Sequence, residues 1–282
     1  MKTRILLIVI IGLFGVAFAN GQKAKLEVKV ISFNIRQSGM AEQDGENKWD
    51  NRKDAIIKMI EQEAPPVFGL QEALLEQVQY IETNLPQYQR IGVGRDDGKN
   101  AGEFMAIFFL SQKFNLLQNG TFWLSATPDS VSKGWDAACF RTVTWVRLQD
   151  KESKKEFYYF DTHFDHQGLA ARENSAKLVL KKIREIVGKK ENIVLGGDFN
   201  SAISDPIFNP LKKYLDVARE CSPITDNKGT FNGFGSTPNN IVLDHFFCKN
   251  VTCKIFKTLD GNYGVPYISD HYPIEFVFEL SH

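Results

Sequence analysis

The sequence predicts an α/β domain in which mixed β-sheets pack together and helices lie on the outside. Short apolar segments typical of strands often follow one another directly, while a few amphipathic segments typical of helices separate the others. No Pro-, Gly- or Ser-rich linker, internal repeat or low-complexity tract divides the chain. The 22 Phe residues suit a thick apolar core. We therefore expect one large domain.

The first residues have the pattern of a secretory signal peptide. Lys2 and Arg4 precede an almost wholly apolar run at residues 5–18, and Ala17-Phe18-Ala19 is a small-x-small cleavage signal. The run is shorter than the roughly 20 apolar residues that span a membrane, so we expect export rather than anchoring. The expected products are a signal peptide at residues 1–20 and a periplasmic or extracellular domain at residues 21–282, with no transmembrane segment.

Two kinds of apolar pattern predict the strands. Residues 25–34 and 141–148 alternate apolar and polar side chains, which is typical of a strand with one buried face. Residues 67–72 and 193–195 begin as continuous apolar runs, which favours strands buried on both faces. An Asn-Gly pair, typical of hairpin turns, breaks the segment 114–124. In chain order the expected strands are residues 25–34, 67–72, 88–93, 104–110, 114–124, 141–148, 156–164, 193–195, 241–248, 251–259 and 272–280.

Apolar side chains at helical spacing predict the helices. Residues 49–63 carry one apolar stripe, and the following Pro65 and Pro66 stop a helix. Residues 169–187 form the clearest amphipathic pattern, which ends at Gly188. The other expected helices are residues 73–84 and 206–214, and the expected loops are residues 36–48, 94–102, 125–138 and 222–240.

The charges of the chain balance. It carries 34 Lys and Arg and 34 Asp and Glu, which gives a formal net charge of zero. Proteins that bind duplex DNA usually show a basic excess. The balance therefore argues weakly against a long nucleic-acid substrate, although a local basic patch could be hidden in the total.

The cysteines suggest at most one local bridge. Cys248 and Cys253 flank an expected turn between two strands, so a disulfide across that turn is one possibility. Free, half-buried thiols are the other. No CxxC pair and no Cys/His spacing typical of zinc sites occurs in the sequence.

Polar side chains recur where the expected strands end. Asp198 and Asn200 follow a buried run and Gly196-Gly197, where the backbone can approach a ligand closely. Residues i and i+2 share one face of a strand, so both would lie where open α/β sheets bind ligands. A polar turn alone would also explain this pair. The recurrence favours a functional site, and its members are Asn34, Glu72, His163, Asp198, Asn200, Asp244, Asp270 and His271.

Six short motifs occur in an order that resembles the endonuclease/exonuclease/phosphatase superfamily, whose members include DNase I. They are Ser32-Phe33-Asn34, Leu70-Gln71-Glu72, Thr162-His163, Gly197-Asp198-Phe199-Asn200, Leu243-Asp244 and Ser269-Asp270-His271. The resemblance extends from about residue 28 to residue 279 and is to an exported bacterial branch. It implies a four-layer α/β sandwich, two packed mixed sheets flanked by helices, and a metal-dependent phosphoric ester hydrolase.

The resemblance assigns metal ligation to Glu72, Asn34 and Asp270. A phosphoester is anionic and repels nucleophiles, so a cation is needed to neutralise it. Mg²⁺ prefers oxygen ligands and binds through one or two carboxylates together with phosphate and water. Mg²⁺ is therefore the expected cofactor, with Mn²⁺ or Ca²⁺ as alternatives.

The resemblance also assigns the catalytic groups. Two histidines flank the scissile phosphate in the family, and a His can hold or deliver a proton near neutral pH. The assigned residues are His163 and His271 as the acid–base pair, Asp198 to activate water, Asn200 and Arg141 to hold phosphoryl oxygens, Asp244 to orient His271, and Glu103 to pair with His163. Which His is the acid and which the base stays open.

Three departures bear on the substrate. DNase I-like nucleases carry a Tyr two residues before the glutamate, where this chain has Ala101, and Asp165 and His166 are unlike most nucleases. A phosphorylated small molecule, or a sugar- or lipid-linked phosphodiester, is at least as well favoured as nucleic acid. The competing hypotheses are a secreted DNase I-like nuclease and a non-catalytic binding protein that kept the fold.

Overall fold

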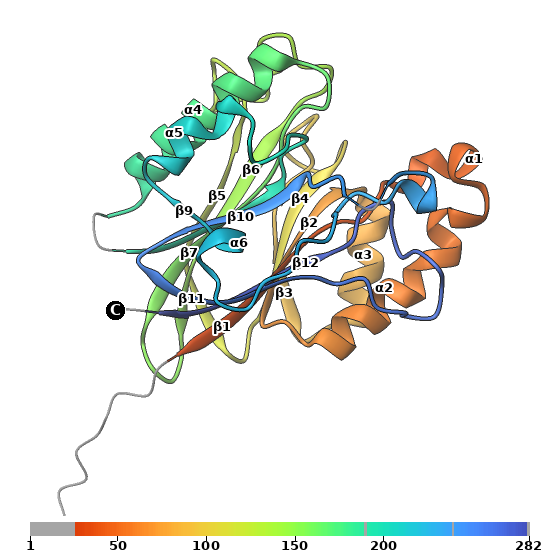
Figure 1. The fold of residues 1–282 in the computed structure, drawn as a ribbon, viewed down its shortest axis with the longest axis horizontal. Helices are drawn as coiled ribbons and strands as arrows, with labels where there is room; N and C mark the ends of the chain where they lie inside the picture. The colour runs from red at the N-terminus through yellow and green to blue at the C-terminus, as the bar shows by residue number, and fades with distance from the viewer. Residues whose placement is uncertain (1–25, 189–190, 239, 281–282) are drawn as a thin grey trace, which may run out of the picture.

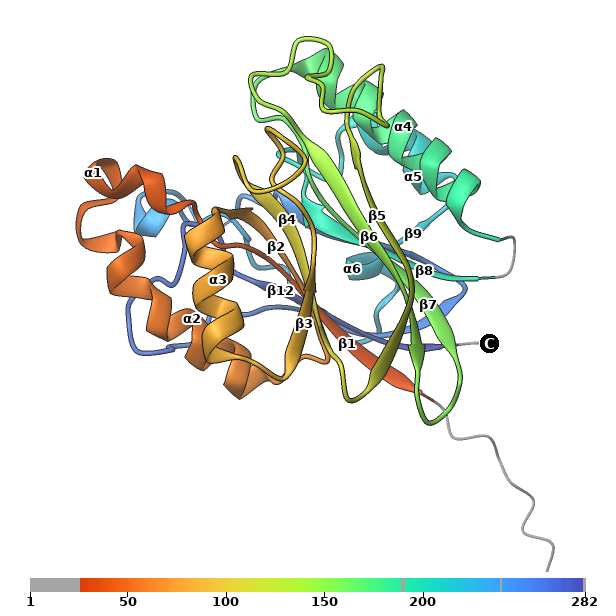
Figure 2. The same ribbon diagram turned by 180° about the vertical axis from the view of Figure 1, so that it is seen from behind.

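The computed structural model describes residues 26–188, 191–238 and 240–280. Two six-stranded mixed β-sheets pack face to face, and helices cover their outer faces (Figures 1 and 2). This arrangement confirms the predicted four-layer α/β fold. The expected signal peptide at residues 1–20 lies outside the described residues. Among the described residues, no helix has the length and apolar character needed to cross a membrane.

The first sheet carries the N- and C-terminal strands. Its order is β11-β12-β1-β2-β4-β3, with β1 and β2 parallel and the other neighbours antiparallel. Two helices, α2 and α3, cover its outer face (Figure 2). The bounds are β1 Glu27–Asn34, β2 Val67–Ala73, β3 Tyr88–Ile91, β4 Phe104–Leu110, β11 Val251–Thr258, β12 Ile274–Leu280, α2 Trp49–Glu63 and α3 Leu75–Asn84.

The second sheet comes from the middle of the chain. Its order is β5-β6-β7-β8-β10-β9, with β7 and β8 parallel. The long helix α4 and the short α5 cover its outer face (Figure 1). The bounds are β5 Phe114–Trp123, β6 Thr142–Asp150, β7 Glu156–His163, β8 Asn192–Asp198, β9 Asp216–Val217, β10 Asp244–Lys249, α4 Leu169–Ile186, α5 Asn209–Lys212 and α6 Ala218–Cys221.

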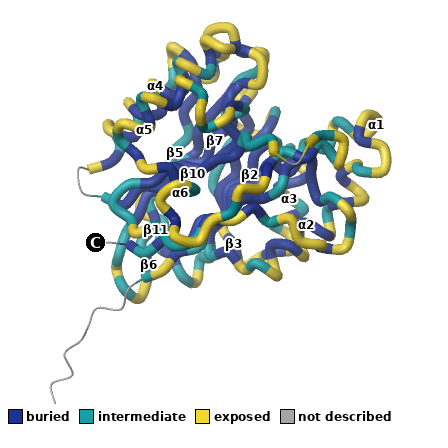
Figure 3. Tube along the Cα trace, viewed as in Figure 1, coloured by how far each residue is buried: buried dark blue, intermediate teal, exposed yellow. Residues whose placement is uncertain are grey.

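Aromatic side chains fill the space between the two sheets. The ring centroid of Phe157 in the second sheet lies 5.7 Å from that of Phe114 in the same sheet and 5.8 Å from that of Phe278 in the first sheet. Figure 3 shows that most strands are buried, whereas the helices alternate buried and exposed residues along their length; the edge strands β5 and β11 are more exposed. The abundance of Phe thus serves a double-sheet core, as the composition suggested.

Several expected boundaries differ from the structure. The Asn119-Gly120 pair forms no hairpin but lies inside β5. The reason is packing: a Cβ at Gly120 would lie 2.9 Å from Nε1 of Trp145, so glycine leaves room for the indole of the neighbouring strand. Short helical turns also occur in three segments. The expected loop at residues 36–48 contains η1 Ser38–Met40, α1 Ala41–Asp44 and η2 Gly45–Asn47, and the expected loop at residues 222–240 contains η4 Gly233–Gly235. The expected helix at residues 206–214 begins with η3 Pro206–Phe208.

The suggested bridge between Cys248 and Cys253 is wrong. Cys253 is bonded to Cys221 of α6, which is 32 residues away in sequence. Cys248 is a buried free thiol with its Sγ 3.6 Å from that of Cys253, and Cys139 is a half-buried free thiol. Burial raises the pKa of the Cys248 thiol to about 12, so it stays protonated at neutral pH. The turn between β10 and β11 does bring Cys248 close, but α6 supplies the partner.

Candidate active site

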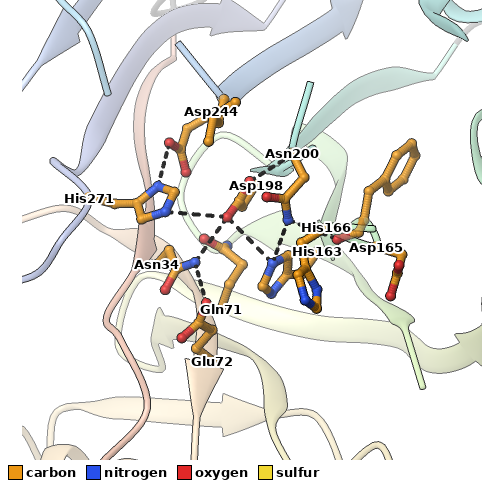
Figure 4. Close-up of polar contacts among 12 residues, drawn as sticks. Asn34, Gln71, Glu72, His163, Asp165, His166, Asp198, Asn200, Asp244 and His271 are labelled. Atoms are coloured by element: carbon orange, nitrogen blue, oxygen red, sulfur yellow. Dashed lines mark hydrogen bonds and ion pairs between the residues drawn. The ribbon is translucent and has the colours of Figure 1, made fainter. Parts of the chain in front are cut away.

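The polar strand ends meet at one edge of the two sheets. In each sheet the parallel strands end side by side: β1 ends at Asn34 and β2 at Ala73, directly after Glu72, while β7 and β8 end at His163 and Asp198. In the second sheet Asp244, the first residue of β10, pairs with Asp198. Figure 4 shows these side chains pointing toward one another.

A pocket of about 530 Å³ lies over this edge. The structure therefore brings together the residues singled out in the sequence, which came from distant segments. Those that line the pocket are Glu72, Glu103, Arg141, His163, Asp198, Asn200, Asp270 and His271. Asn34 and Asp244 lie just behind it and contact the lining residues.

Asp198 is the central group. Its Oδ2 accepts a hydrogen bond from Asn34 Nδ2 at 2.9 Å and lies 3.4 Å from His163 Nε2 and 3.6 Å from His271 Nε2. Its Oδ1 accepts from the backbone N–H of Asn200 at 2.9 Å. Burial raises the pKa of Asp198 to about 7, against the lowering effect of His271. A carboxylate with such a pKa can accept a proton near neutral pH.

The two histidines have different surroundings and different charge states. His271 donates from Nδ1 to Asp244 Oδ2 at 2.8 Å. Burial alone would lower its pKa, but the carboxylates of Asp244 and Asp198 hold the pKa of His271 well above the usual value. Burial, followed by the charges of two arginines, lowers the pKa of His163 well below the usual value. At neutral pH His271 is therefore a cation and His163 is neutral.

His163 is held by Asn200 rather than by a carboxylate. Asn200 donates from Nδ2 to Nε2 of His163 at 3.0 Å and to the carbonyl oxygen of Phe164 at 3.0 Å. Nδ1 of His163 lies 4.0 Å from Glu103 Oε2, which is too far for a hydrogen bond. The expected hydrogen-bonded pairing of Glu103 with His163 is thus not formed, and Glu103 forms its ion pair with Arg95 instead.

The groups expected to hold a metal lie on the other side of Asp198. Glu72, in a left-handed conformation with φ of 63°, accepts from Asn34 Nδ2 at 3.0 Å. Burial, and then repulsion by Glu72, raises the pKa of Asp270. Two carboxylates that line one pocket fit a hard divalent cation, which would relieve the repulsion that raises the pKa of Asp270.

Asn34 does not present its oxygen to this site. Its Oδ1 accepts from the backbone N–H of Arg36 at 3.1 Å, and its Nδ2 faces Glu72 and Asp198. In this arrangement Asn34 positions the two carboxylates. A second group, Asp198 with Asp244 and His271, has its ligand atoms within 4.8 Å of one another and could hold an ion instead.

Arg141 is anchored by Asp165 and His166. Its Nε lies 3.4 Å from Asp165 Oδ2, and its Nη2 lies 3.0 Å from His166 Nδ1. Burial would raise the pKa of Asp165, but backbone N–H groups, that of Gly168 first, bring it down to about 2. Asp165 is therefore a fixed anion that aims the guanidinium into the pocket.

The sequence reasoning missed a buried polar network beneath the pocket. Gln71 donates from Nε2 to Asp161 Oδ1 at 2.6 Å and to Ser32 Oγ at 3.2 Å. Tyr159 donates to the same Asp161 oxygen at 3.3 Å. The network joins the two sheets, because Gln71 belongs to β2 of the first sheet and Asp161 to β7 of the second. Gly69 makes room for it, because a Cβ there would lie 2.6 Å from the Asp161 carboxylate. An available signal was an Asp inside an aromatic strand, two residues before His163.

This network predicts a measurable pH dependence of stability. Burial raises the pKa of Asp161 well above its usual value, so the folded chain keeps a proton that the unfolded chain releases above about pH 4. Wild-type stability should therefore fall as pH rises from about 4 to the folded pKa, by up to about 1.4 kcal/mol per pH unit. Asp161→Asn should remove this loss, so the difference in unfolding free energy between variant and wild type grows with pH.

Urea unfolding at pH 5, 6.5 and 8 tests this expectation. Asp129→Asn is the control, because Asp129 is an exposed carboxylate on a loop. Its difference from wild type should stay flat over the same range. A difference for Asp161→Asn that is equally flat would show that Asp161 is ionised in the folded protein.

The comparisons with known proteins fit this geometry. The model of the Endonuclease/Exonuclease/phosphatase family matches residues 31–271. An endonuclease/exonuclease/phosphatase from Bacteroides vulgatus is 36% identical, with a TM-score of 0.86 over 91% of this chain and 100% of that chain. A mannosyl-6-phosphatase from Bacteroides thetaiotaomicron is 34% identical, with a TM-score of 0.84 over 89% and 99%. A TDP2 from D. rerio, solved with a single-strand DNA product, is 16% identical with a TM-score of 0.70 over 89% and 98%, a likeness that shows the fold alone.

Proposed function

Because this chain belongs to the endonuclease/exonuclease/phosphatase family, we propose that it is an exported, divalent-metal-dependent hydrolase of a phosphomonoester or phosphodiester. One observation carries the proposal. A central carboxylate, Asp198, lies between a neutral His163 and a cationic His271, and faces the carboxylates of Glu72 and Asp270 across one pocket. This set contains a base, a proton donor and an oxygen-rich cation site.

The water molecule that attacks phosphorus would be activated by Asp198. Its Oδ2 takes a proton from that water as the new P–O bond forms, and the bond to the leaving oxygen breaks. His271, kept cationic by Asp244, presents Nε2–H to the phosphoryl oxygens or to the leaving oxygen. Arg141 would hold the remaining oxygens, because its planar fork matches phosphate. Asn200 donates both Nδ2 hydrogens, to His163 and to the Phe164 carbonyl oxygen, so it would orient His163 rather than hold a phosphoryl oxygen.

Glu72 and Asp270 are the residues that would hold the cation. A bound Mg²⁺, or Mn²⁺ or Ca²⁺ in its place, would supply neutralisation of the phosphate charge. Asn34 keeps Glu72 and Asp198 apart and oriented through its two N–H contacts. This role explains why an amide rather than a third carboxylate stands between them.

A phosphorylated sugar is the substrate class that we favour. The support is the 34% identity to a mannosyl-6-phosphatase over nearly the whole chain, together with the zero net charge. A sugar- or lipid-linked phosphodiester is the next candidate. Nucleic acid is less favoured, because the relative solved with DNA shares only the fold.

A substrate panel tests the proposed activity. The purified chain should hydrolyse sugar phosphates or p-nitrophenyl esters with Mg²⁺ or Mn²⁺ and lose this activity in chelator, while sphingomyelin and plasmid DNA serve as competing substrates. Preferred cleavage of plasmid DNA with a steep salt dependence would favour the nuclease. Binding without hydrolysis of any ester would favour the non-catalytic protein. N-terminal sequencing of the secreted product, expected to start near Asn20 or Gly21, tests export separately.

A further inference from the structure

Two buried arginines form one wall of the pocket. Arg95, from the loop before β4, and Arg141, just before β6, are 9% and 5% exposed, and both line the pocket. Arg95 forms an ion pair with Glu103, and Arg141 Nη1 lies 3.9 Å from the same Glu103 Oε2. One carboxylate thus holds two guanidinium groups beside each other on the His163 side of the pocket.

Each of the two guanidinium groups has one N–H donor that no described group of the protein accepts. Among the described residues, Arg141 Nη1 and Arg95 Nε are buried N–H groups without a hydrogen-bond partner. Leaving a buried cationic donor unpaired is unfavourable, and an unpaired donor in a pocket points to a ligand that brings the acceptor. The neighbouring acids do not meet this need. Asp165 accepts from four backbone N–H groups, and Asp96 is half exposed with its Oδ1 3.7 Å from Arg95 Nε.

The loop that carries Arg95 is built to hold it still. The backbone N–H of Arg95 donates to the carbonyl oxygen of Glu103 at 3.0 Å, and Trp123 donates from Nε1 to the carbonyl oxygen of Arg95 at 2.8 Å. Asp97 accepts from the N–H groups of Lys99 and Ala101 and closes the loop. A guanidinium positioned in this way loses little further freedom when it binds an anion.

We propose that Arg95 and Arg141 form a subsite for the extra anionic oxygen of a phosphomonoester, and that Arg95 thereby selects monoesters over diesters. This inference rests on the proposed phosphoesterase function and names its substrate class. A monoester presents three non-bridging oxygens and a second charge that ionises with a pKa of about 6. A diester has an ester group in place of one of these oxygens, so it would leave the buried donors unpaired. Sites built to pair a polar group discriminate strongly against an analogue that lacks it.

Arg95→Gln tests the subsite through a ratio of rates. In the metal-loaded enzyme, kcat/KM for p-nitrophenyl phosphate divided by that for bis(p-nitrophenyl) phosphate should fall at least about tenfold. The inhibition constant of inorganic phosphate should rise with it. Arg95→Lys keeps the charge beside Glu103 but loses the fork, so a smaller fall of the ratio, about threefold, is expected. Arg147→Gln, which removes an ion-paired arginine of β6 that does not line the pocket, should leave the ratio unchanged.

The outcomes separate this inference from the function on which it rests. A wild type that hydrolyses either ester, with variants that slow both esters equally, overturns the subsite alone and makes Arg95 a support for Glu103. A folded wild type that hydrolyses neither ester overturns the proposed function as well. If Arg95→Gln does not fold, the ratio for Arg95→Lys decides, and an unchanged ratio there contradicts the selection of monoesters.

Discussion

Replacing His271 by alanine is expected to lower kcat for phosphoester hydrolysis by about 10²–10⁴-fold, while the protein still folds. The structure holds the pKa of His271 well above its usual value, so at neutral pH this side chain brings both a proton and a positive charge. Its Nε2 lies 3.6 Å from Asp198, where the attacking water would bind. Steady-state kinetics on the best substrate of the panel, with a thermal melt beside it, measures both parts of this expectation.

His245 provides a matched control for His271. It is also buried and follows Asp244 directly, but its Nε2 is engaged with the carbonyl oxygen of Ser201 at 2.8 Å, and it does not line the active-site pocket. His245→Gln should change stability more than kcat. The loss of kcat in Asp244→Asn should lie between those of His271→Ala and His245→Gln. The ring of His271 stays in this variant but loses the carboxylate that keeps it charged. Undiminished turnover in His271→Ala would remove His271 from the mechanism.

The sequence located the strand ends because their pattern is local. An apolar run followed by Asp198 and Asn200, or by Glu72, marks a strand that leaves a sheet, and the order of such motifs identified the family and the fold, both now confirmed. The structure adds what is not local. Asn34 and Asp198 are 164 residues apart, and only the packing of the two sheets places them 2.9 Å from each other.

The misses have the same physical origin. Alternation and apolar runs tell which face of a strand is buried, but not what it meets in the opposite sheet. The pattern of β7 therefore predicted a core strand and left the contact of Asp161 with Gln71 unseen. The pairing of Cys221 with Cys253 depends on where α6 docks, which turn spacing does not encode. In the sequence Arg95 is one of several charged residues in a polar loop, and only the fold places it in an ion pair with Glu103.

Glu72→Gln is expected to weaken Mg²⁺ binding and to reduce metal-supported turnover by at least about 10²-fold. Replacing groups that merely support a ligand typically costs 10–100-fold, so the loss of a ligand's own charge should cost no less. Gln would also turn an N–H₂ or a neutral oxygen toward Asn34 Nδ2, which now donates to Glu72 at 3.0 Å. Calorimetric titration with Mg²⁺ and kcat measured against Mg²⁺ concentration report the two effects. Glu156→Gln, at the far end of β7 in an ion pair with Arg147, is the control and should change Mg²⁺ affinity by no more than about twofold.

The same titration decides between the two places where a cation could bind. If the ion lies between Glu72 and Asp270, Asp270→Asn should weaken binding as Glu72→Gln does, while Asp244→Asn should lower kcat with little change in Mg²⁺ affinity. If the group of Asp198, Asp244 and His271 holds the ion, the order is reversed and Asp244→Asn gives the larger loss of affinity. The electrostatics favour the first arrangement, because the cationic His271 already lies between Asp244 and Asp198 and would repel a second cation there. In the part of the chain that the structure describes, the pair of Glu72 and Asp270 makes one ion pair, in which Arg36 Nη1 lies 3.7 Å from Asp270 while the rest of the guanidinium is on Asp44.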